Sequence, residues 1–263
     1  MTLPISVFII TKNESDRIAT AINSVIDWAN EVVVIDSGST DDTVSVASFI
    51  GARVLYNEWE GYGKQKRFAE EECENNWLLN IDADEEITPE LAEEIKKIFA
   101  SGEPDADAFI IDVRDLLPNE IKLAPLAHTN RCLRLYRFDK GRFSKSPVHD
   151  SVIMNKGCKI KNLKNPILHR SFRSISHAIE KMNSYSDMQA KELAAGKGMS
   201  LPRLRLVFEF SAAFVKSYFL RLYILRGVKG IIHANIYAFG RVMRIAKYIE
   251  IKESKGNKET NNN

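Results

Sequence analysis

The sequence predicts an α/β protein in which strands alternate with helices and build a largely parallel sheet. The first observation is an apolar, β-branched run at residues 3–11, LPISVFIIT, typical of a strand buried on both faces of a sheet. Similar runs recur at residues 31–36 and 77–82. Segments with apolar residues at helical spacing separate these runs, and short connections between them favour right-handed βαβ units.

The segments that follow the first strand continue this alternation. We expect a helix at residues 18–29, because apolar side chains recur there at helical spacing after the capping-type residue Asn13. Thr88 and Pro89 are an N-cap and a first-turn proline for a helix that runs to about Phe99. The other expected elements are strands at 31–36, 52–56 and 77–82 and helices at 41–50 and 64–73.

The pattern changes in the second half of the chain. Strands are expected at 108–113 and 133–138, with a loop between them at 114–130. From Leu204 onward, two apolar stripes at helical spacing predict a basic amphipathic helical hairpin. The expected domains are an α/β domain at residues 1–200, a helical extension at residues 201–253 and a disordered tail at residues 254–263.

Composition excludes several protein classes. With 263 residues, 44% hydrophobic and 27% charged, the chain is too apolar for a disordered protein and lacks the composition of collagen. Its three cysteines, Cys73, Cys132 and Cys158, form no CxxC pair, so neither a disulfide scaffold nor a thiolate metal site is indicated, and a reducing compartment fits best. We expect no signal peptide and no helix that crosses a bilayer.

Charge is unevenly distributed. Residues 200–263 carry a net charge of +8, which leaves −6 for the rest of a chain whose total is +2. A basic terminal segment indicates an anionic partner, either nucleic acid or an anionic membrane surface. The acidic body argues against nucleic acid that wraps the whole protein.

Three polar clusters lie where predicted strands end, and ligands bind at this edge of α/β sheets. The clusters occupy residues 11–14, 36–41 and 82–85. Neither GxGxxG nor GxxxxGK[ST] occurs at any of them, so dinucleotide-type and Walker-type phosphate binding are not supported.

The third cluster has the ligand types of a divalent-cation site. Asp82 and Asp84 flank a single alanine, and Mg²⁺ or Mn²⁺ typically binds one or two protein carboxylates together with substrate phosphates. Such an ion would neutralise the charge that grows on a departing diphosphate. The alternative is an acidic, solvated loop before a helix.

The other polar residues also have a structural interpretation as well as a functional one. Asp36 either accepts hydrogen bonds from a planar heterocycle or closes an Asx turn with Gly38. Thr11, Asn13 and Glu14 either cap a helix or contact a ribose, and Lys64 and Lys66 either line a phosphate or face solvent.

Taken together and in this order, ISVFIITKNES, EVVVIDSGSTDDT, WEGYGKQKRFA, WLLNIDADEEIT and SPVHDSVI resemble the family 2 inverting glycosyltransferases of the GT-A fold. The resemblance is greatest to the lipopolysaccharide-core branch, which adds a β-linked glucose to the inner-core heptose. It extends from about Leu3 to about Tyr248 and implies a GT-A domain followed by a helical extension.

The resemblance also implies roles for individual residues. The residues implied to hold the uridine of a UDP-sugar are Thr11, Asn13, Glu14 and Asp36. Lys64 and Lys66 would approach the same nucleotide, and Asp82 would contact the ribose side. Asp84 binds Mn²⁺ or Mg²⁺, and Asp150 is the catalytic base in a motif that usually ends in Glu. An inverting transfer then needs one carboxylate to take the acceptor proton while the metal steadies the leaving diphosphate.

Histidines and arginines are further candidates. His149 and His169 are either metal ligands or orienting groups, or ordinary polar residues. Arg131, Arg134 and Arg137 either meet acceptor phosphates or carboxylates or form the solvated basic face of a strand.

The resemblance implies that the acceptor is a lipid-linked glycan, so the enzyme would act at a membrane surface. The basic extension would dock on anionic lipid, on the cytoplasmic face of the inner membrane. The alternative is that it packs on the α/β domain or on a second subunit. A non-catalytic nucleotide-sugar-binding or membrane-scaffold protein is the rival function, but it would be expected to lack Asp84 or the base, and both are present.

Overall fold

The computed structural model describes residues 2–260 except 121–122, 125–128, 147–149 and 197. The chain divides into two compact units, which we describe separately. The sheet unit comprises Met1–Asp115 and Thr129–His169, and the helical unit comprises Leu116–His128 and Arg170–Asn263.

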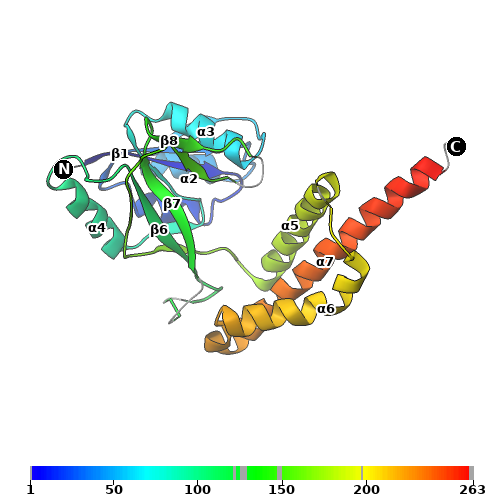
Figure 1. Ribbon diagram of the computed structural model, residues 1–263. Helices are drawn as coiled ribbons and strands as arrows, with labels where there is room; N and C mark the ends of the chain where they lie inside the picture. The colour runs from blue at the N-terminus through cyan, green and yellow to red at the C-terminus, as the bar shows by residue number, and fades with distance from the viewer. Residues whose placement is uncertain (1, 121–122, 125–128, 147–149, 197, 261–263) are drawn as a thin grey trace. The chain divides into compact units, whose positions relative to one another are not determined.

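The sheet unit is built on a mixed sheet with the order β3-β2-β1-β4-β7-β6-β11-β5, in which β10 also pairs with β6 (Figure 1). Its strands are β1 Leu3–Thr11, β2 Ala29–Asp36, β3 Arg53–Tyr56, β4 Trp77–Asn80, β5 Glu85–Ile87, β6 Ala108–Asp115, β7 Thr129–Arg137, β10 Ile160–Asn162 and β11 Ile167–His169. Strands β3, β2, β1 and β4 are mutually parallel, whereas β7 runs antiparallel to both β4 and β6. A separate hairpin joins β8 Gly141–Phe143 to β9 Val152–Met154.

Helices cover both faces of this sheet because its central strands are apolar on both sides. The helices are α1 Ile18–Asn23, α2 Thr43–Ile50, α3 Tyr62–Glu72 and α4 Pro89–Phe99. Alternate side chains of β1 enter two cores: Val7 packs in the core that α1, α2 and α4 share, and Phe8 packs in the core beneath α3. The predicted α/β class is therefore confirmed.

Most predicted elements of the sheet unit are present, with shifted ends. Thr88 caps α4 as expected, since its hydroxyl accepts a hydrogen bond from the Leu91 amide at 3.2 Å. Helix α1 ends at Asn23, six residues before the predicted end. Val25 and Trp28, beyond the end of α1, are nevertheless buried. The apolar spacing therefore predicted which side chains face the core, but not where the helical backbone ends.

The helical unit contains the predicted hairpin and one more long helix. Its helices are α5 Ile175–Ala195, α6 Pro202–Val215, a π-helical turn η1 Lys216–Leu220, a 3₁₀ turn η2 Tyr223–Arg226 and α7 Gly227–Thr260. Helix α7 packs against both α5 and α6, with Ala190, Ala194 and Tyr248 buried at the first contact. No helix in the described part of the chain is long and apolar enough to cross a membrane.

Candidate active site

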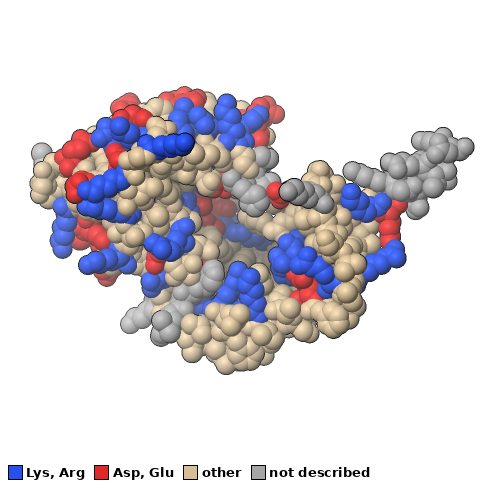
Figure 2. Space-filling view, in the orientation of Figure 1, with Lys and Arg blue, Asp and Glu red and all other residues tan. Residues whose placement is uncertain are grey.

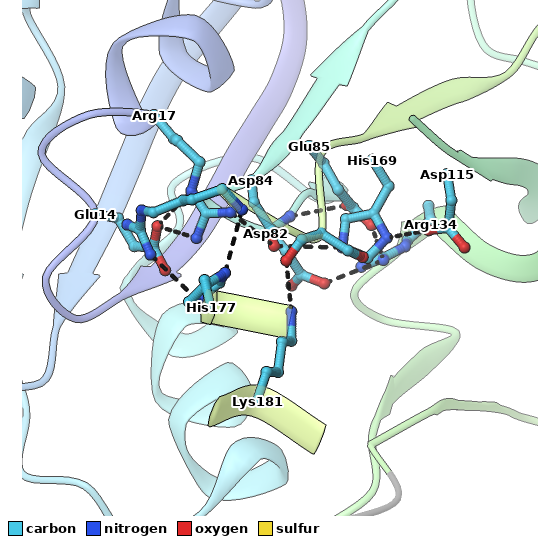
Figure 3. A network of polar contacts seen from close by, with 12 residues as sticks. Glu14, Arg17, Asp82, Asp84, Glu85, Asp115, Arg134, His169, His177 and Lys181 are labelled. Carbon is cyan, nitrogen blue, oxygen red and sulfur yellow. Dashed lines mark hydrogen bonds and ion pairs between the residues drawn. The ribbon is translucent and has the colours of Figure 1, made fainter. Parts of the chain in front are cut away.

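Strand ends bring the predicted polar clusters to one edge of the sheet. Thr11 ends β1 beside Asp36, which ends β2, and the two residues are register partners. Strand β4 lies on the other side of β1 and is followed directly by Asp82 and Asp84. Because these three strands are parallel, their carboxyl ends form a common rim, where carboxylates and basic side chains gather (Figure 3).

The loops after β1 and β2 hold each other in place. One carboxylate oxygen of Asp36 accepts hydrogen bonds from the amides of Gly38 at 2.8 Å and Ser39 at 2.9 Å, as the Asx-turn alternative requires. Asn13, at a φ of 56°, accepts a hydrogen bond from the Thr40 amide at 2.8 Å. Both residues therefore shape the rim, and their contact with a nucleotide stays a prediction.

Thr11 differs from its neighbours. Its side chain is buried, with 5% exposure of the residue, and its hydroxyl has no hydrogen-bond partner among the described residues. A buried hydroxyl without a partner is costly, so its position at the rim suits contact with a bound polar ligand.

Lys66 links two of the predicted site carboxylates. Its Nζ lies 3.1 Å from an oxygen of Asp82 and 2.6 Å from an oxygen of Asp150, and its side chain is only 4% exposed. Burial alone would lower the pKa of Lys66, but Asp82 and Asp150 outweigh it and raise that pKa above its ordinary value. The site therefore keeps a buried ammonium between two carboxylates at neutral pH.

Arg134 is the second buried cation of the rim. Its guanidinium donates to Glu85 at 2.6 Å, to Asn80 at 2.5 Å and to Asp82 at 3.3 Å. Arg134 is only 7% exposed, so the interpretation of this residue as part of a solvated basic face is wrong, and its contact with an acceptor stays a prediction. Burial would raise the pKa of Asp82, but Lys66 and Arg134 outweigh it and hold that pKa far below its usual range.

His169 lies between two carboxylates at the end of β11 (Figure 3). Its Nε2 is 3.3 Å from an oxygen of Asp84, and its Nδ1 is 2.8 Å from an oxygen of Asp115. Burial would lower the pKa of His169, but the hydrogen bonds to Asp115 and Asp84 outweigh it and raise that pKa to about 10. Arg17 also approaches Asp84, at 3.6 Å.

The other predicted residues differ in their surroundings. Lys64 is about half exposed and pairs with Glu60 at 2.6 Å, so it does not join the buried cluster. Glu14 pairs with Arg17 at 2.5 Å. His149 lies outside the described residues, and no group of three or more potential protein ligands for a metal occurs within them.

Two rim residues were missed by the sequence analysis. Asp115 ends β6 and carried a detectable signal, because it is a carboxylate at a strand end. Arg17 gave no such signal, since it stands alone in a polar stretch before α1.

Comparison with known proteins identifies the architecture around this rim. The family model described as glycosyl transferase family 2 matches residues 6–164, a stretch that contains most of β1, all of β2 and β4, and Asp150. The chain belongs to glycosyltransferase family 2. The family 2 resemblance drawn from the sequence is thereby confirmed.

Two relatives of this glycosyltransferase extend over nearly the whole chain. An uncharacterized glycosyltransferase of Rickettsia conorii is 45% identical over 258 residues, which cover 95% of this chain and 91% of the relative. The lipopolysaccharide core biosynthesis glycosyltransferase LpsC of Rhizobium meliloti is 33% identical over 249 residues, which cover 90% of each chain.

Solved structures of lower overall similarity include glucosyl-3-phosphoglycerate synthase from Mycobacterium tuberculosis, crystallised with Mn²⁺, UDP and glucosyl-3-phosphoglycerate. It is 25% identical, with a TM-score of 0.35, over 44% of each chain.

Proposed function

We propose that this family 2 glycosyltransferase transfers a hexose, glucose in the first instance, from a UDP-sugar to a lipid-linked glycan of the lipopolysaccharide-core type, with inversion at the anomeric carbon. The observation that carries the proposal is the buried bridge from Asp82 through Lys66 to Asp150, at the rim where Asp84 also lies. The name of the Rhizobium relative supports the choice of acceptor.

The donor would be held along the rim by the predicted residues. The unpartnered Thr11 hydroxyl would be satisfied by the nucleotide, and the carboxylate of Asp36 and the side-chain amide of Asn13 would form further hydrogen bonds with it. Lys66, a buried ammonium with three protons, would meet the diphosphate while remaining close to Asp82. Glu14 would contact the ribose, and Lys64 would reach the nucleotide only by leaving Glu60.

The residues around Asp84 fit a divalent cation, Mn²⁺ or Mg²⁺. The Asp84 oxygen and His169 Nε2 are 3.3 Å apart, as in a hydrogen bond from a protonated imidazole, so a cation would bind both residues by displacing the Nε2 proton. Asp115 accepts from the other ring nitrogen and would orient the imidazole, as carboxylates do behind metal-bound histidines. When bound, the ion would supply Lewis-acid stabilisation of the leaving diphosphate.

Asp150 would act as the base. Its carboxylate, held by Lys66 at 2.6 Å, would take the proton from the acceptor hydroxyl as that oxygen attacks the anomeric carbon. No covalent sugar–enzyme intermediate is required, and inversion follows from a single displacement. Asp150 is one methylene shorter than the glutamate usual in this motif, so the acceptor must approach correspondingly closer.

The helical unit would bring the enzyme to an anionic membrane. Thirteen of the 22 exposed large apolar side chains in the described residues lie between Leu201 and Phe239, which localises them to α6, the two turns and the start of α7. Leu201–Ile231 also contains six basic residues and one acidic residue, Glu209, which pairs with Arg241 at 2.9 Å. We call Leu201–Ile231 the apolar-basic surface. In the lower part of Figure 2, uncharged residues (tan) lie next to groups of Lys and Arg (blue).

This combination of apolar and cationic side chains matches the chemistry of an anionic bilayer surface. The proposed site of action is therefore the cytoplasmic face of the inner membrane.

A donor and acceptor screen tests the proposed function. Purified full-length protein is incubated with a panel of UDP-sugars, Mn²⁺ or Mg²⁺ and lipid-linked core glycans, and UDP release is measured. We expect release that depends on one UDP-hexose, on the metal and on the acceptor. Tight UDP binding with no transfer from any donor to any acceptor would favour the rival, non-catalytic nucleotide-sugar-binding function.

A further inference from the structure

Glu70 is a buried carboxylate that joins three elements of the sheet unit. It lies in α3, one turn beyond Lys66, and is only 1% exposed. One of its oxygens accepts hydrogen bonds from the Tyr136 hydroxyl of β7 at 2.6 Å and from the Phe143 amide of β8 at 2.8 Å. The other oxygen accepts from Arg142 Nε, also in β8, at 3.1 Å. Glu70 therefore connects α3 both to the main sheet and to the hairpin of β8 and β9.

The surroundings of this carboxylate are otherwise apolar. Phe8, Ala69, Tyr136 and Phe143 belong to the core beneath α3. Burial and the Glu70 carboxylate raise the pKa of Tyr136 well above its ordinary value, so the phenol remains a donor at neutral pH. A well-packed apolar residue often stabilises a core as well as a buried ion pair does. What the carboxylate adds is direction, because hydrogen bonds hold their partners at defined distances and angles.

The hairpin depends on such contacts because β8 and β9 form a two-stranded sheet of their own. A hairpin of two strands is only marginally stable by itself. The Ser144 amide donates to the Ser151 carbonyl at 2.8 Å, which extends the hairpin to the residue next to Asp150. Arg67 of α3 adds a second link, from its guanidinium to the Phe143 carbonyl at 3.0 Å. The attachment of the hairpin to α3 therefore sets where Asp150 lies.

We propose that Glu70 is a positioning residue, which holds the hairpin of β8 and β9 against α3 and β7 and so fixes the location of Asp150. The inference rests on the proposed function, in which Asp150 is the base, and adds a buried residue that acts through this base and not on the substrates. Because α3 also packs on β1 and β2, loss of the Glu70 contacts should loosen the hairpin without displacing Lys66.

Glu70→Leu tests the inference in the full-length protein, because leucine is of similar size but accepts no hydrogen bond. Turnover with the UDP-sugar and acceptor found in the screen should fall roughly ten- to a hundredfold, with calorimetric UDP affinity unchanged. Glu70→Gln, whose carbonyl oxygen still accepts hydrogen bonds, should lose less turnover, and it should fold even if Glu70→Leu does not.

Glu71→Gln is the matched control. Glu71 is the next residue of α3 and pairs with the same Arg142 at 2.7 Å, but it is exposed. Its replacement removes an equal charge from the same partner outside the core, so turnover should stay at the wild-type level.

A double variant separates positioning of the base from a general loss of folding. If Glu70 acts through Asp150, adding Glu70→Leu to Asp150→Asn should slow the remaining turnover little. Two losses that multiply in the double variant would show that Glu70 acts independently of Asp150, and would overturn the inference.

Hydrogen exchange tests the same contacts without any transfer reaction. Amides of β8 and β9 should exchange faster in Glu70→Leu than in the wild type and Glu71→Gln, whereas amides of β1 and β2 should not change. A wild type that transfers no sugar contradicts the proposed function, and exchange in the hairpin then decides this inference by itself. Equal exchange of the hairpin in all three proteins would overturn it, as would a fall in UDP affinity that matches the fall in turnover.

Discussion

The groups around Lys66 all interact favourably with its positive charge. Its ammonium lies 3.1 Å from Asp82 and 2.6 Å from Asp150, and 5.0 Å from the centre of the Phe143 ring. A buried carboxylate that loses its partner retains its desolvation cost without the compensating attraction. The stability of the rim and its charge balance therefore depend on the same side chain.

Replacing Lys66 with methionine should destabilise the fold. The expected loss is about 1–3 kcal/mol in the free energy of unfolding, because Asp82 and Asp150, whose side chains are 34% and 21% exposed, would each lose a charged partner. Urea unfolding measures it, with Lys64→Met on the exposed side of the same helix as control. Equal stability of the two variants would show that the bridge is not a stabilising contact.

Asp150→Asn separates binding from chemistry. The amide keeps the size of the side chain but cannot take a proton, so turnover should fall by about 10²–10⁴-fold. Calorimetric UDP affinity should stay nearly unchanged, because the role proposed for Asp150 is on the acceptor side of the sugar. If Asp150→Asn retains wild-type turnover, the base is another residue.

Part of the site could be predicted from single residues. Asp36, Asp82 and Asp84 follow apolar runs, and their meeting at one rim follows from parallel pairing. The partners Arg134 and His169 could not be assigned, because they come from β7 and β11, whose pairing is set by contacts between distant parts of the chain.

At the scale of elements, the position of α3 depends on Gly63. A Cβ at this residue would lie 2.2 Å from the Ser144 carbonyl oxygen and 2.5 Å from that of Ser146, which are backbone atoms and cannot turn aside. The Gly63 amide also donates to the Ser146 carbonyl at 3.0 Å. This close approach brings Lys66, one turn further along α3, to Asp150.

Gly63→Ala should therefore push α3 away from residues 144–146. We expect a loss of about 1–3 kcal/mol in unfolding free energy, as for other overpacked sites, together with weaker UDP binding. Thermal unfolding and calorimetry measure the two effects. Glu71→Ala, at an exposed position of the same helix, is the control. Equal behaviour of both variants would contradict this role of Gly63.

Elements with strong local patterns were predicted well, and short ones were not. The buried runs of β1, β2 and β4 and the capped helix α4 are present as expected. Strands β5, β10 and β11 contain three residues each, too few for a periodic signal, and helix α5 was missed because its exposed face carries Ile175, Ile179 and Tyr185, which blurs the contrast between faces.

At the scale of the whole molecule, charge and apolar exposure are concentrated in the helical unit. The net charge of +8 in residues 200–263 coincides in sequence with most of the exposed apolar side chains. The sequence predicted this asymmetry in charge. It could not predict which apolar residues are exposed, because an apolar stripe on a helix does not show whether another element covers it.

Membrane binding should therefore depend on the apolar-basic surface. Phe208→Ser with Phe219→Ser and Leu220→Ser should abolish co-sedimentation with anionic vesicles. Replacing Arg203, Arg205 and Lys216 with glutamine should weaken it by about 3 kcal/mol, near 1 kcal/mol for each charge. Phe49→Ser, which removes a 93% exposed phenylalanine from α2, is the control. Undiminished binding of both combined variants would rule out docking through this surface.

In the proposed mechanism, the carboxylates of the rim hold a cation that assists departure of a nucleoside diphosphate. The most direct measurement is calorimetric UDP affinity with and without Mn²⁺, for the wild type and for Asp84→Asn, with exposed Asp105→Asn as control. We predict that Mn²⁺ strengthens UDP binding roughly tenfold or more in the wild type and the control but not in Asp84→Asn. A UDP affinity of the wild type that does not change with Mn²⁺, or an equal increase in UDP affinity with Mn²⁺ in Asp84→Asn, would contradict this mechanism.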